Sequence, residues 1–392
     1  MRILLLGVGL QGRTALSDLV RSPDVTSVLA ADQDINRLAD FADTLETDKV
    51  ECLQVDVRDP NELAALLDRD VDLVIELLPS AFQTTVLKLA VRHGKHAVST
   101  TYDDGLSALH EAAEKNDVAI MPESGLDPGL DLVLCRLAID RLDEVHELYS
   151  YGAGIPERAA ATNPLHYKIS WNFDDVLKAY NRPARVLRDG QTVDVPAEQL
   201  LAPPSLHAVA IDGVGELEAF PNADALAYAD RFGIRRSVRS TGRYSMRWPG
   251  HGQLLGQLID LGFLSDAPVE TEGGRIAPRA FLRDHLGPQM QYNADERDLA
   301  ILRVDARGIK DGVETRIVYD LVDRRDLSTG FLAMNRTVGF TASIVAQMIL
   351  RGDIARRGVL SPTSDIPGDA LLDELRKRGV IITQKAGPNP TH

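Results

Sequence analysis

The sequence predicts an α/β protein with a Rossmann-type, doubly wound parallel sheet and a second, α+β substrate domain built on a largely antiparallel sheet. Short apolar runs alternate with amphipathic stretches as far as Pro122, which is typical of βαβ units. A glycine-rich turn lies between the first apolar run and the first helical stretch. After Gly125, longer segments rich in Val, Ile, Leu and Tyr replace this alternation.

The first part of the chain contains six expected strands, the number found in a doubly wound dinucleotide-binding domain. Each strand is a short apolar run, and each stretch between two strands is amphipathic. The strands are expected at residues 2–6, 25–30, 50–55, 73–77, 96–99 and 118–121, and the helices at 12–21, 34–44, 61–68, 83–92 and 106–116.

The second part has the alternation of an open, largely antiparallel sheet and ends in helical stretches. Strands are expected at residues 145–153, 216–220, 237–247, 299–306 and 314–319, followed by helices at 333–350 and 368–378 and a short strand at 380–383. We therefore expect an NAD-binding Rossmann domain over residues 1–126 and a substrate and dimerisation domain over 127–335. Residues 336–392 are expected to form C-terminal helices that return to the first domain.

Composition excludes several classes of partner. The 43 basic residues face 58 acidic ones, giving a net charge of -15 without a basic block, so nucleic acid is not expected. No apolar run approaches the ~20 residues that span a bilayer, and no signal peptide is recognised, so we expect a cytoplasmic protein without a membrane partner. Cys52 and Cys135 lack the spacing of a zinc site, so no metal is expected. A homodimer is expected from common symmetry.

The turn Gly7-Val8-Gly9-Leu10-Gln11-Gly12 follows a strand and opens a helix, which is the context of a dinucleotide fingerprint. The first glycine makes the tight turn, the second lets the backbone approach the pyrophosphate, and the third lets helix pack on strand. The phosphates then lie at a helix N-terminus. The predicted cofactor contacts in this turn are Gly7, Gly9, Leu10, Gln11 and Gly12.

Asp32 favours NAD over NADP. It ends the second strand 20 residues after Gly12, where a carboxylate accepts hydrogen bonds from the adenosine ribose and repels a 2′-phosphate. The alternative interpretation is an aspartate that only serves the turn beside Asp34. Further cofactor contacts are expected at the ends of the third and fourth strands, at Asp56, Val57, Leu78 and Pro79.

Several longer motifs are distributed over nearly the whole chain. They are residues 72–75 (DLVI), 78–79 (LP), 99–102 (STTY), 125–131 (GLDPGLD), 163–171 (NPLHYKISW), 220–222 (FPN), 247–250 (RWPG) and 296–298 (ERD). In these motifs the chain resembles the saccharopine dehydrogenase (glutamate-forming) family, also called saccharopine reductases, and its relative lysine 6-dehydrogenase.

The resemblance implies a pyridine-nucleotide oxidoreductase that acts on the CH–NH bond of a lysine-derived amino acid. In the saccharopine reaction a secondary amine is oxidised to an imine and hydrolysed, or the reverse occurs. Lysine 6-dehydrogenase, which oxidatively deaminates the lysine side chain, is the alternative on the same scaffold. An alternative of another class is a non-catalytic NAD-binding regulator.

Amine oxidation needs a neutral nitrogen, and a lysine-like amine has a pKa near 10, so a base should lie close to the nitrogen. Asp127 is the first candidate because it follows the last Rossmann strand at the edge where ligands bind. The alternative is an N-cap followed by a favoured first helical residue, Pro128. Leu126 is expected to contact the substrate beside it.

The resemblance implies substrate contacts at Thr101, Tyr102, Lys168 and Trp171, with Tyr102 and Lys168 joining Asp127 as catalytic candidates. A tyrosine that caps a strand and a surface lysine are the alternatives. Arg247 is the predicted carboxylate ligand because its planar fork binds such a group bidentately, the alternative being an unrelated ion pair. Ser245 is a further predicted contact.

The chain departs from saccharopine reductases at three positions. Those enzymes tend to carry Arg in place of Asp32, Arg in place of Ala223, and Cys in place of Gly152. Since a hydrogen bond to a charged group contributes roughly 1.5–3 kcal/mol, the missing arginine at Ala223 implies a weaker hold on one substrate carboxylate. Asp32 resembles the NAD-using lysine 6-dehydrogenases.

Overall fold

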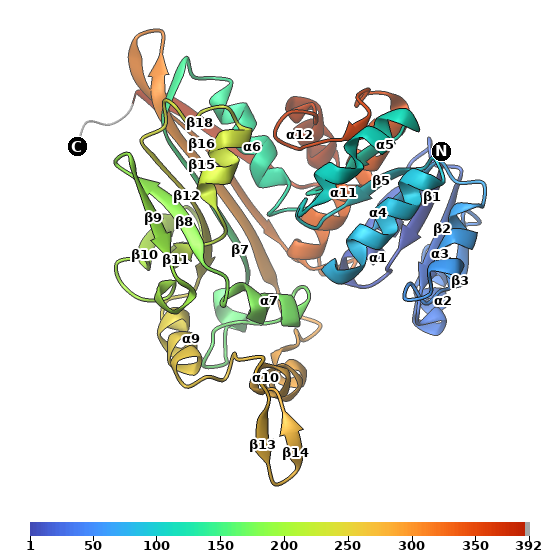
Figure 1. Cartoon of the computed structure of the whole chain (residues 1–392), viewed down its shortest axis with the longest axis horizontal. Coiled ribbons are helices and arrows are strands. Elements are labelled where there is room, and N and C mark those ends of the chain that lie inside the picture. Colours follow the sequence, from blue (N-terminus) through green and yellow to red (C-terminus); the bar gives the residue numbers. More distant parts are fainter. Residues whose placement is uncertain (389–392) are drawn as a thin grey trace. The chain divides into compact units, whose positions relative to one another are not determined.

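The structure is a computed structural model that describes residues 1–388. The chain forms two compact units, and each unit contains two separate stretches of sequence. Unit 1 comprises Met1–Arg136 and Asn335–Ile381, and unit 2 comprises Leu137–Met334 and, among the described residues, Ile382–Pro388. In Figure 1 the blue N-terminal strands and the red helix α12 accordingly belong to the same unit.

Unit 1 is built on a seven-stranded parallel sheet with the strand order β3-β2-β1-β4-β5-β6-β17. Its first six strands have the doubly wound order, in which ligands bind at the carboxyl ends where the order reverses, here between β1 and β4. The predicted Rossmann-type sheet is confirmed. The strands are β1 Arg2–Leu6, β2 Ser27–Asp32, β3 Val50–Gln54, β4 Leu73–Glu76, β5 His96–Ser99, β6 Ala119–Met121 and β17 Gly358–Val359.

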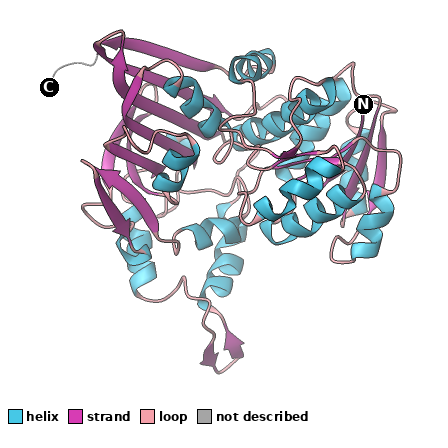
Figure 2. Cartoon of the chain, turned by 45° about the horizontal axis from the view of Figure 1, so that its top comes forward, coloured by secondary structure: helices cyan, strands magenta, loops and turns pink. Residues whose placement is uncertain are grey.

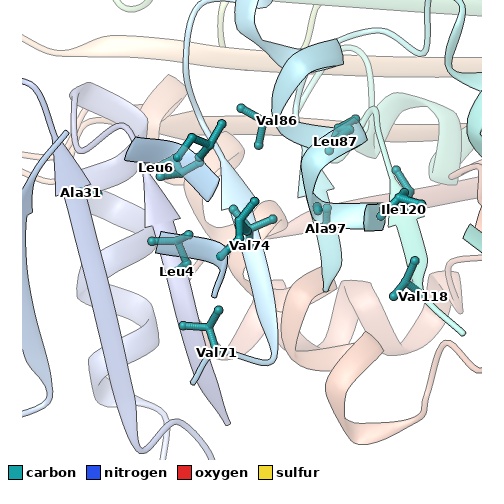
Figure 3. Close-up of a cluster of buried hydrophobic side chains, with 14 of the residues drawn as sticks. Leu4, Leu6, Ala31, Val71, Val74, Val86, Leu87, Ala97, Val118 and Ile120 are labelled. Atoms are coloured by element: carbon teal, nitrogen blue, oxygen red, sulfur yellow. The ribbon is translucent and has the colours of Figure 1, made fainter. Parts of the chain in front are cut away.

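The core of unit 1 follows from the alternation of side chains along each strand. Leu4, Leu6 and Val74 are fully buried on one face of the sheet, where they contact Val86 and Leu87 of helix α4 (Figure 3). The helices in this part of the chain are α1 Leu10–Arg21, α2 Ile35–Asp43, α3 Pro60–Leu67, α4 Gln83–Arg92, α5 His110–Lys115 and α6 Leu130–Ile139.

Two C-terminal helices, α11 Ala333–Arg351 and α12 Gly368–Lys377, complete unit 1. A Cβ at Gly339 of α11 would lie 2.7 Å from the carbonyl oxygen of Gln11, so the two backbones approach closely only because the residue is glycine. Asp18 of α1 accepts a hydrogen bond from Ser343 of α11 at 2.6 Å and forms a salt bridge with Arg378 at 2.6 Å.

Unit 2 is built on a nine-stranded sheet with the order β10-β11-β12-β7-β15-β16-β18, in which β8 and β9 join through β12. Among the strand pairs of this sheet within residues 1–388, only β12–β7 is parallel, so the predicted largely antiparallel sheet is confirmed. The long strands β7, β15 and β16 run side by side (Figures 1 and 2). The strands are β7 Glu144–Pro156, β8 Ala184–Arg188, β9 Gln191–Val195, β10 His207–Ile211, β11 Gly215–Pro221, β12 Ser240–Arg247, β15 Asp298–Lys310, β16 Val313–Arg324 and β18 Ile382–Pro388.

A separate hairpin, β13 Val269–Thr271 with β14 Gly274–Ile276, pairs only with itself and projects from the rest of unit 2 in Figures 1 and 2. The sequence reasoning missed it, together with β8, β9 and β10, and each of these strands has only three to five residues. The remaining helices of the unit are α7 Phe173–Ala179, α8 Ala225–Arg231, α9 His251–Asp260 and α10 Pro278–Leu286.

The chain crosses between the units at different residues from those predicted. The first crossing falls within α6, between Arg136 and Leu137, because residues 130–136 of this helix belong to the Rossmann unit and the second domain does not start at residue 127. The predicted return of residues 336–392 as a whole is wrong at its end. Strand β18 pairs with β16, Ile382 opposite Leu321, and therefore belongs to unit 2.

The described helices of both units are too short or too polar to resemble membrane-spanning helices. The longest, α11, has 19 residues and includes Asn335, Arg336 and Gln347. No helix within residues 1–388 combines the length and apolar character needed to cross a bilayer.

Candidate cofactor and substrate sites

The glycine turn of unit 1 has the backbone geometry of a phosphate-binding loop. Gly7 has φ +86°, and a Cβ there would lie 2.7 Å from the carbonyl oxygen of Leu77 on the neighbouring strand segment. A Cβ at Gly12 would collide with the carbonyl oxygen of Gly7. At Gly9, by contrast, a Cβ would meet nothing within 4 Å, so the turn leaves space beside this backbone. These are the three roles expected of a dinucleotide loop.

Helix α1 begins directly after this turn with an N-terminus suited to an anion. Gly9 is its N-cap, no side chain caps it, and its first turn carries no acidic residue. Leu10 is exposed and Gln11 is half-buried at its first two positions. Free backbone N–H groups and the helix dipole at such an N-terminus attract phosphate groups. The residues present therefore fit a dinucleotide.

Asp32 ends β2 and contacts the glycine turn directly. Its carboxylate accepts hydrogen bonds from the backbone N–H of Val8 at 2.7 Å and of Asp34 at 3.1 Å. Each carboxylate oxygen retains a lone pair for a ribose hydroxyl. Asp32 thus serves the turn, and the same geometry suits it to a ribose.

Two arginines lie near this carboxylate. Arg13 of α1 stacks on the ring of Phe41 at 5.1 Å, and its Nη2 donates to the carbonyl oxygen of Arg37 at 3.5 Å. Burial and the neighbouring Arg37 lower the pKa of Arg13, whereas Asp32 and Asp34 act to raise it. The adenosine end of the site therefore combines a carboxylate with nearby positive charge.

The other predicted cofactor contacts differ in what they can offer. Asp56 is half-buried and forms a salt bridge with Arg58 at 2.7 Å, and the hydrogen bonds from Arg58 lower the pKa of the carboxyl to about 2. Val57 and Leu78 are partly buried and pack against the core of the sheet. Pro79 is exposed after β4. The Asp56 carboxylate is thus already paired with Arg58, in a solvent-accessible ion pair.

Glu76, which the sequence analysis did not single out, is fully buried at the carboxyl end of β4. It accepts hydrogen bonds from the hydroxyl of Ser99 at 2.6 Å and from the backbone N–H of Leu78 at 2.9 Å. Gln83 of α4 donates to Ser99 Oγ at 3.2 Å and to the carbonyl oxygen of Thr101 at 3.1 Å. Burial raises the pKa of Glu76 to about 7, against the effect of its two donors.

The segment after β5 is held by backbone hydrogen bonds. Thr101 donates its N–H to Ser99 Oγ at 3.2 Å, and its carbonyl oxygen accepts from the N–H of Glu123 at 3.0 Å. Thr101 and Tyr102 are both half-buried. Together with Glu76 they lie at the carboxyl ends of adjacent strands, the edge at which ligands bind in this fold.

Asp127 lies in a tight loop rather than at a helix N-cap. Gly125 donates to the carbonyl oxygen of Pro128 at 3.1 Å, and Gly129 donates to the Asp131 carboxylate at 2.8 Å before α6 begins at Leu130. The alternative interpretation of Asp127 as an N-cap is therefore wrong, because Pro128 and Gly129 separate it from the first residue of the helix. Leu126, beside it, is buried.

In unit 2, Arg247 of β12 is a buried cation held by neutral groups. Its Nε donates to the Tyr180 hydroxyl at 3.0 Å and its Nη1 to the Met246 carbonyl oxygen at 2.8 Å. The rings of Tyr167, Tyr180 and Phe220 surround the guanidinium at 5.2, 5.8 and 5.9 Å. Within residues 1–388 it forms no salt bridge, although burying an unpaired charge is costly.

The acidic residue closest in register to Arg247 is bonded elsewhere. Glu218 is paired with Arg247 across the β11–β12 ladder, but its carboxylate accepts from the backbone N–H groups of Gly250 and Gly252. Nη2 of Arg247 has no hydrogen-bond partner in the described chain and is not fully enclosed. The end of the guanidinium fork that carries Nη1 and Nη2 is thus the end available to a carboxylate.

A chain of hydrogen bonds behind Arg247 fixes its orientation. His251 Nδ1 lies 2.7 Å from the Leu165 carbonyl oxygen, so this nitrogen carries the proton, and Nε2 accepts from the Tyr180 hydroxyl at 2.8 Å. The Tyr180 oxygen can then accept from Arg247 Nε. Burial, followed by the charge of Arg247, lowers the pKa of His251 to about 3, so the imidazole stays neutral at physiological pH.

Lys168 and Trp171 occupy different environments from Arg247. Lys168 is buried and bonds both oxygens of Glu296, at 2.6 and 2.5 Å. Burial acts to raise the pKa of Glu296, but this pair and the Asn293 N–H lower it overall. Trp171 is partly buried against the apolar cluster of unit 2. Lys168 is therefore neutralised within the chain, unlike Arg247.

Comparison with known proteins gives the family. The family model described as the saccharopine dehydrogenase C-terminal domain matches residues 125–380, and the one described as the saccharopine dehydrogenase NADP binding domain matches residues 3–121. The chain belongs to the saccharopine dehydrogenase family. The predicted family and its oxidoreductase class are thus confirmed.

Relatives within the saccharopine dehydrogenase family match at modest identity. A saccharopine dehydrogenase [NADP(+), L-glutamate-forming] of Pyricularia oryzae is 29% identical over 85% of this chain and 88% of its own. An α-aminoadipic semialdehyde synthase of Arabidopsis thaliana is 27% identical over 89% of this chain, which spans only 40% of that protein. The solved apo saccharopine dehydrogenase (L-Glu forming) of Saccharomyces cerevisiae is 25% identical, with a TM-score of 0.86 over 98% of this chain and 99% of its own.

The comparison supports a nicotinamide cofactor, but the name of the Pyricularia relative and the description of the family model that matches residues 3–121 specify NADP rather than the predicted NAD. Two further departures from saccharopine reductases can now be placed in unit 2. Gly152 of β7 is the register partner of Ser245, a half-buried residue of β12 that shares a face with Arg247. Ala223 follows β11 with φ +62°, in the turn before α8.

The sequence reasoning missed Glu76, Tyr180 and His251 as a site. Glu76 stands inside an apolar run that was interpreted only as a strand, although a carboxylate at a buried strand position is itself a signal. Tyr180 and His251 lie 71 residues apart and meet only in the fold. His251 is a structural residue with two buried hydrogen-bond partners.

Proposed function

We propose that this protein is an NAD-dependent dehydrogenase that oxidises the CH–NH bond of a saccharopine-type amino acid, or catalyses the reverse. The observation that carries the proposal is Arg247, a buried guanidinium without a carboxylate partner in the described chain. In a dehydrogenase family, such a group suits a substrate that brings its own carboxylate. The end-on Nη1–Nη2 fork supplies two parallel N–H donors for it.

The chemistry requires few groups from the protein. The bound dinucleotide would supply the hydride acceptor, held by the glycine turn and Asp32. Asp127 takes the proton of the amine nitrogen, and hydride loss from the adjacent carbon leaves an imine. Water adds to the imine carbon, and the C–N bond then breaks to release an amino acid and an aldehyde. Tyr102 and Thr101 contact the substrate at the same strand edge.

The preference for NAD is supported by the Asp32 carboxylate and weakened by the positive charge of Arg13 and Arg37. A 2′-phosphate would meet like charge at Asp32, and the site has no arginine in its place. Fluorescence titration of the purified chain with NADH and NADPH tests this. We expect NADH to bind at least about 10-fold more tightly; equal affinity or tighter binding of NADPH would contradict the NAD assignment.

The second candidate is lysine 6-dehydrogenase, favoured by Ala223, since a lysine substrate has one carboxylate and needs fewer arginines. A panel of saccharopine, lysine and opine-type secondary amines with NAD, monitored by NADH absorbance, separates the two. Saccharopine turnover with glutamate release supports the first proposal. Ammonia release from lysine replaces it with the second. NAD binding without turnover across the panel would favour the non-catalytic regulator.

A further inference from the structure

Glu76 combines complete burial with a position at the nicotinamide side of the dinucleotide site. The adenosine ribose is assigned to the end of β2 and the pyrophosphate to the turn after β1, so the cofactor continues toward β4 and β5. Glu76 is the last residue of β4, and its partner Ser99 is the last residue of β5. Both therefore end strands on the nicotinamide half of the sheet.

The groups around Glu76 are neutral on every side. Strand β5 contributes Ser99, helix α4 contributes Gln83, and the following loop contributes the Leu78 N–H. Strand β1 contributes Leu6, the register partner of Glu76. Within residues 1–388, no salt bridge involves Glu76 and no charged side chain contributes to the shift of its pKa.

The hydrogen bonds around Glu76 have a direction that favours its ionised form. Ser99 Oγ accepts from Gln83 and from the Thr101 N–H, so its own proton is available to the Glu76 carboxylate. The Leu78 N–H donates to the second carboxylate oxygen. The site thus prepares a buried negative charge but supplies no cation to balance it, although an uncompensated buried charge is unstable.

The oxidised and reduced forms of a nicotinamide cofactor differ by one positive charge on the ring. A buried carboxylate near the ring attracts the oxidised form and has no such attraction for the reduced form. We propose that Glu76 is a specificity-determining residue that makes the protein bind the oxidised cofactor in preference to the reduced one, with ionised Glu76 as the counter-charge. The inference rests on the nicotinamide cofactor of the proposed function and not on its substrate.

The proposal predicts a pH dependence with a definite sign. Burial raises the pKa of Glu76 to about 7, so the carboxylate is largely protonated at pH 6 and largely ionised at pH 8. The preference for the oxidised cofactor should therefore increase with pH. Binding of the oxidised form near pH 7 should release a proton from Glu76, whereas binding of the reduced form should not.

Calorimetric titration of the full chain with NAD+ and NADH at pH 6, 7 and 8 tests the inference without any substrate. We expect the ratio of the two dissociation constants to shift toward NAD+ by about 3- to 10-fold between pH 6 and 8. Repeating the titration in buffers of different ionisation enthalpy counts the protons released. Glu76→Gln should abolish both the shift and the proton release, and Glu111→Gln, an exposed carboxylate on α5, should abolish neither.

The Ser99→Ala variant provides a second test if the Glu76→Gln variant fails to fold. It removes one donor to the charged form, so the pH midpoint of the preference should move upward while the preference remains. A flat ratio in the wild-type protein, or an unchanged pH dependence in a folded Glu76→Gln variant, overturns the proposal. If the chain prefers the phosphorylated cofactor, NADP+ and NADPH carry the same charge difference and replace the pair, so a failed NAD assignment remains distinguishable.

Discussion

At the scale of single residues, a variant of Arg247 tests whether this buried arginine binds the substrate or only supports the fold. Arg247→Lys keeps the charge but loses the Nε donor to Tyr180 and the planar fork. We expect KM for a carboxylate-bearing substrate to rise about 10- to 100-fold with a smaller change in kcat, which steady-state kinetics will measure. Arg283→Lys, at an exposed ion pair with Asp284, is the matched control. An unchanged KM would make Arg247 a structural residue.

Asp32 has two roles that a pair of variants can separate. Asp32→Ala removes both the charge and the acceptor for the Val8 N–H, whereas Asp32→Asn can retain the acceptor. Both should narrow the preference for NADH over NADPH by roughly 10-fold, because the like charge that repels a 2′-phosphate is gone. Titrations followed by cofactor fluorescence give the ratio. An unaltered ratio in both variants would refute the assignment of Asp32 to the ribose.

The residues that could be predicted from the sequence are those with local signals. The glycine turn and Asp32 could be predicted because they lie at a characteristic spacing within one strand–turn–helix–strand segment. The structure places them side by side, as expected. Lys168 and Arg247 could be predicted as site residues. The sequence could not show that Lys168 is paired with a carboxylate whereas Arg247 is not. Only the fold shows that Glu296 neutralises Lys168 while Glu218 bonds backbone N–H groups beside Arg247.

At the scale of elements, a polar network joins the C-terminal helices to α1. Asp18→Asn leaves Arg378 with Glu374 as its remaining partner, in a largely buried position. We expect the free energy of unfolding of unit 1 to fall by about 2 kcal/mol, less than for a buried pair with no second partner. Denaturation monitored by hydrogen exchange in α11 and α12 measures the loss.

The control for this network is an exposed salt bridge on helix α12. Asp373→Asn breaks the salt bridge to Arg376, where both side chains are more than half exposed. A change under about 1 kcal/mol is expected there. Equal losses in the two variants would show that the Asp18 pair adds nothing beyond a surface interaction.

A helix or strand can be predicted from the sequence when its residues form a clear apolar pattern. Strands β1 and β5 and helix α4 were predicted residue for residue, because buried parallel strands and their amphipathic helices carry dense apolar patterns. Strands β13 and β14 are exposed throughout and gave no such pattern. Strand β18 was predicted in part. Its partner strand β16 pairs with it across 61 (Leu321 to Ile382) to 73 (Thr315 to Pro388) positions of sequence, which local patterns do not reveal.

At the scale of the whole molecule, pH should act on the two units through different groups. The pKa of His251 is lowered to about 3, so its contribution to unit 2 is complete above about pH 6.5 and is lost as pH falls toward 3. His251→Gln should reduce the loss of stability of unit 2 between pH 6.5 and 4. Urea denaturation across this range, with unit 2 followed by hydrogen exchange, measures the difference.

Comparison between variants is needed because other groups titrate in the same range with opposite sign. Burial raises the pKa of Asp298 to about 6 and that of Glu76 to about 7. Each of these contributes stability at low pH that is lost as pH rises through its folded-state pKa. The stability profile of the wild-type protein sums the contributions of these groups, so a His251→Gln profile parallel to that of the wild type would contradict the prediction.

The homodimer and the cytoplasmic location remain predictions.

The exchange of C-terminal segments between the units bears on how the chain is made. Unit 1 needs residues 335–381, and the sheet of unit 2 gains its edge strand β18 only from residues 382–388. A ribosome makes each of these segments only after most of the unit that it completes. The Rossmann strands β1 to β6 emerge well before residues 335–381, and β16 emerges before β18, so the nascent chain must keep two unfinished surfaces from aggregating until these later segments emerge.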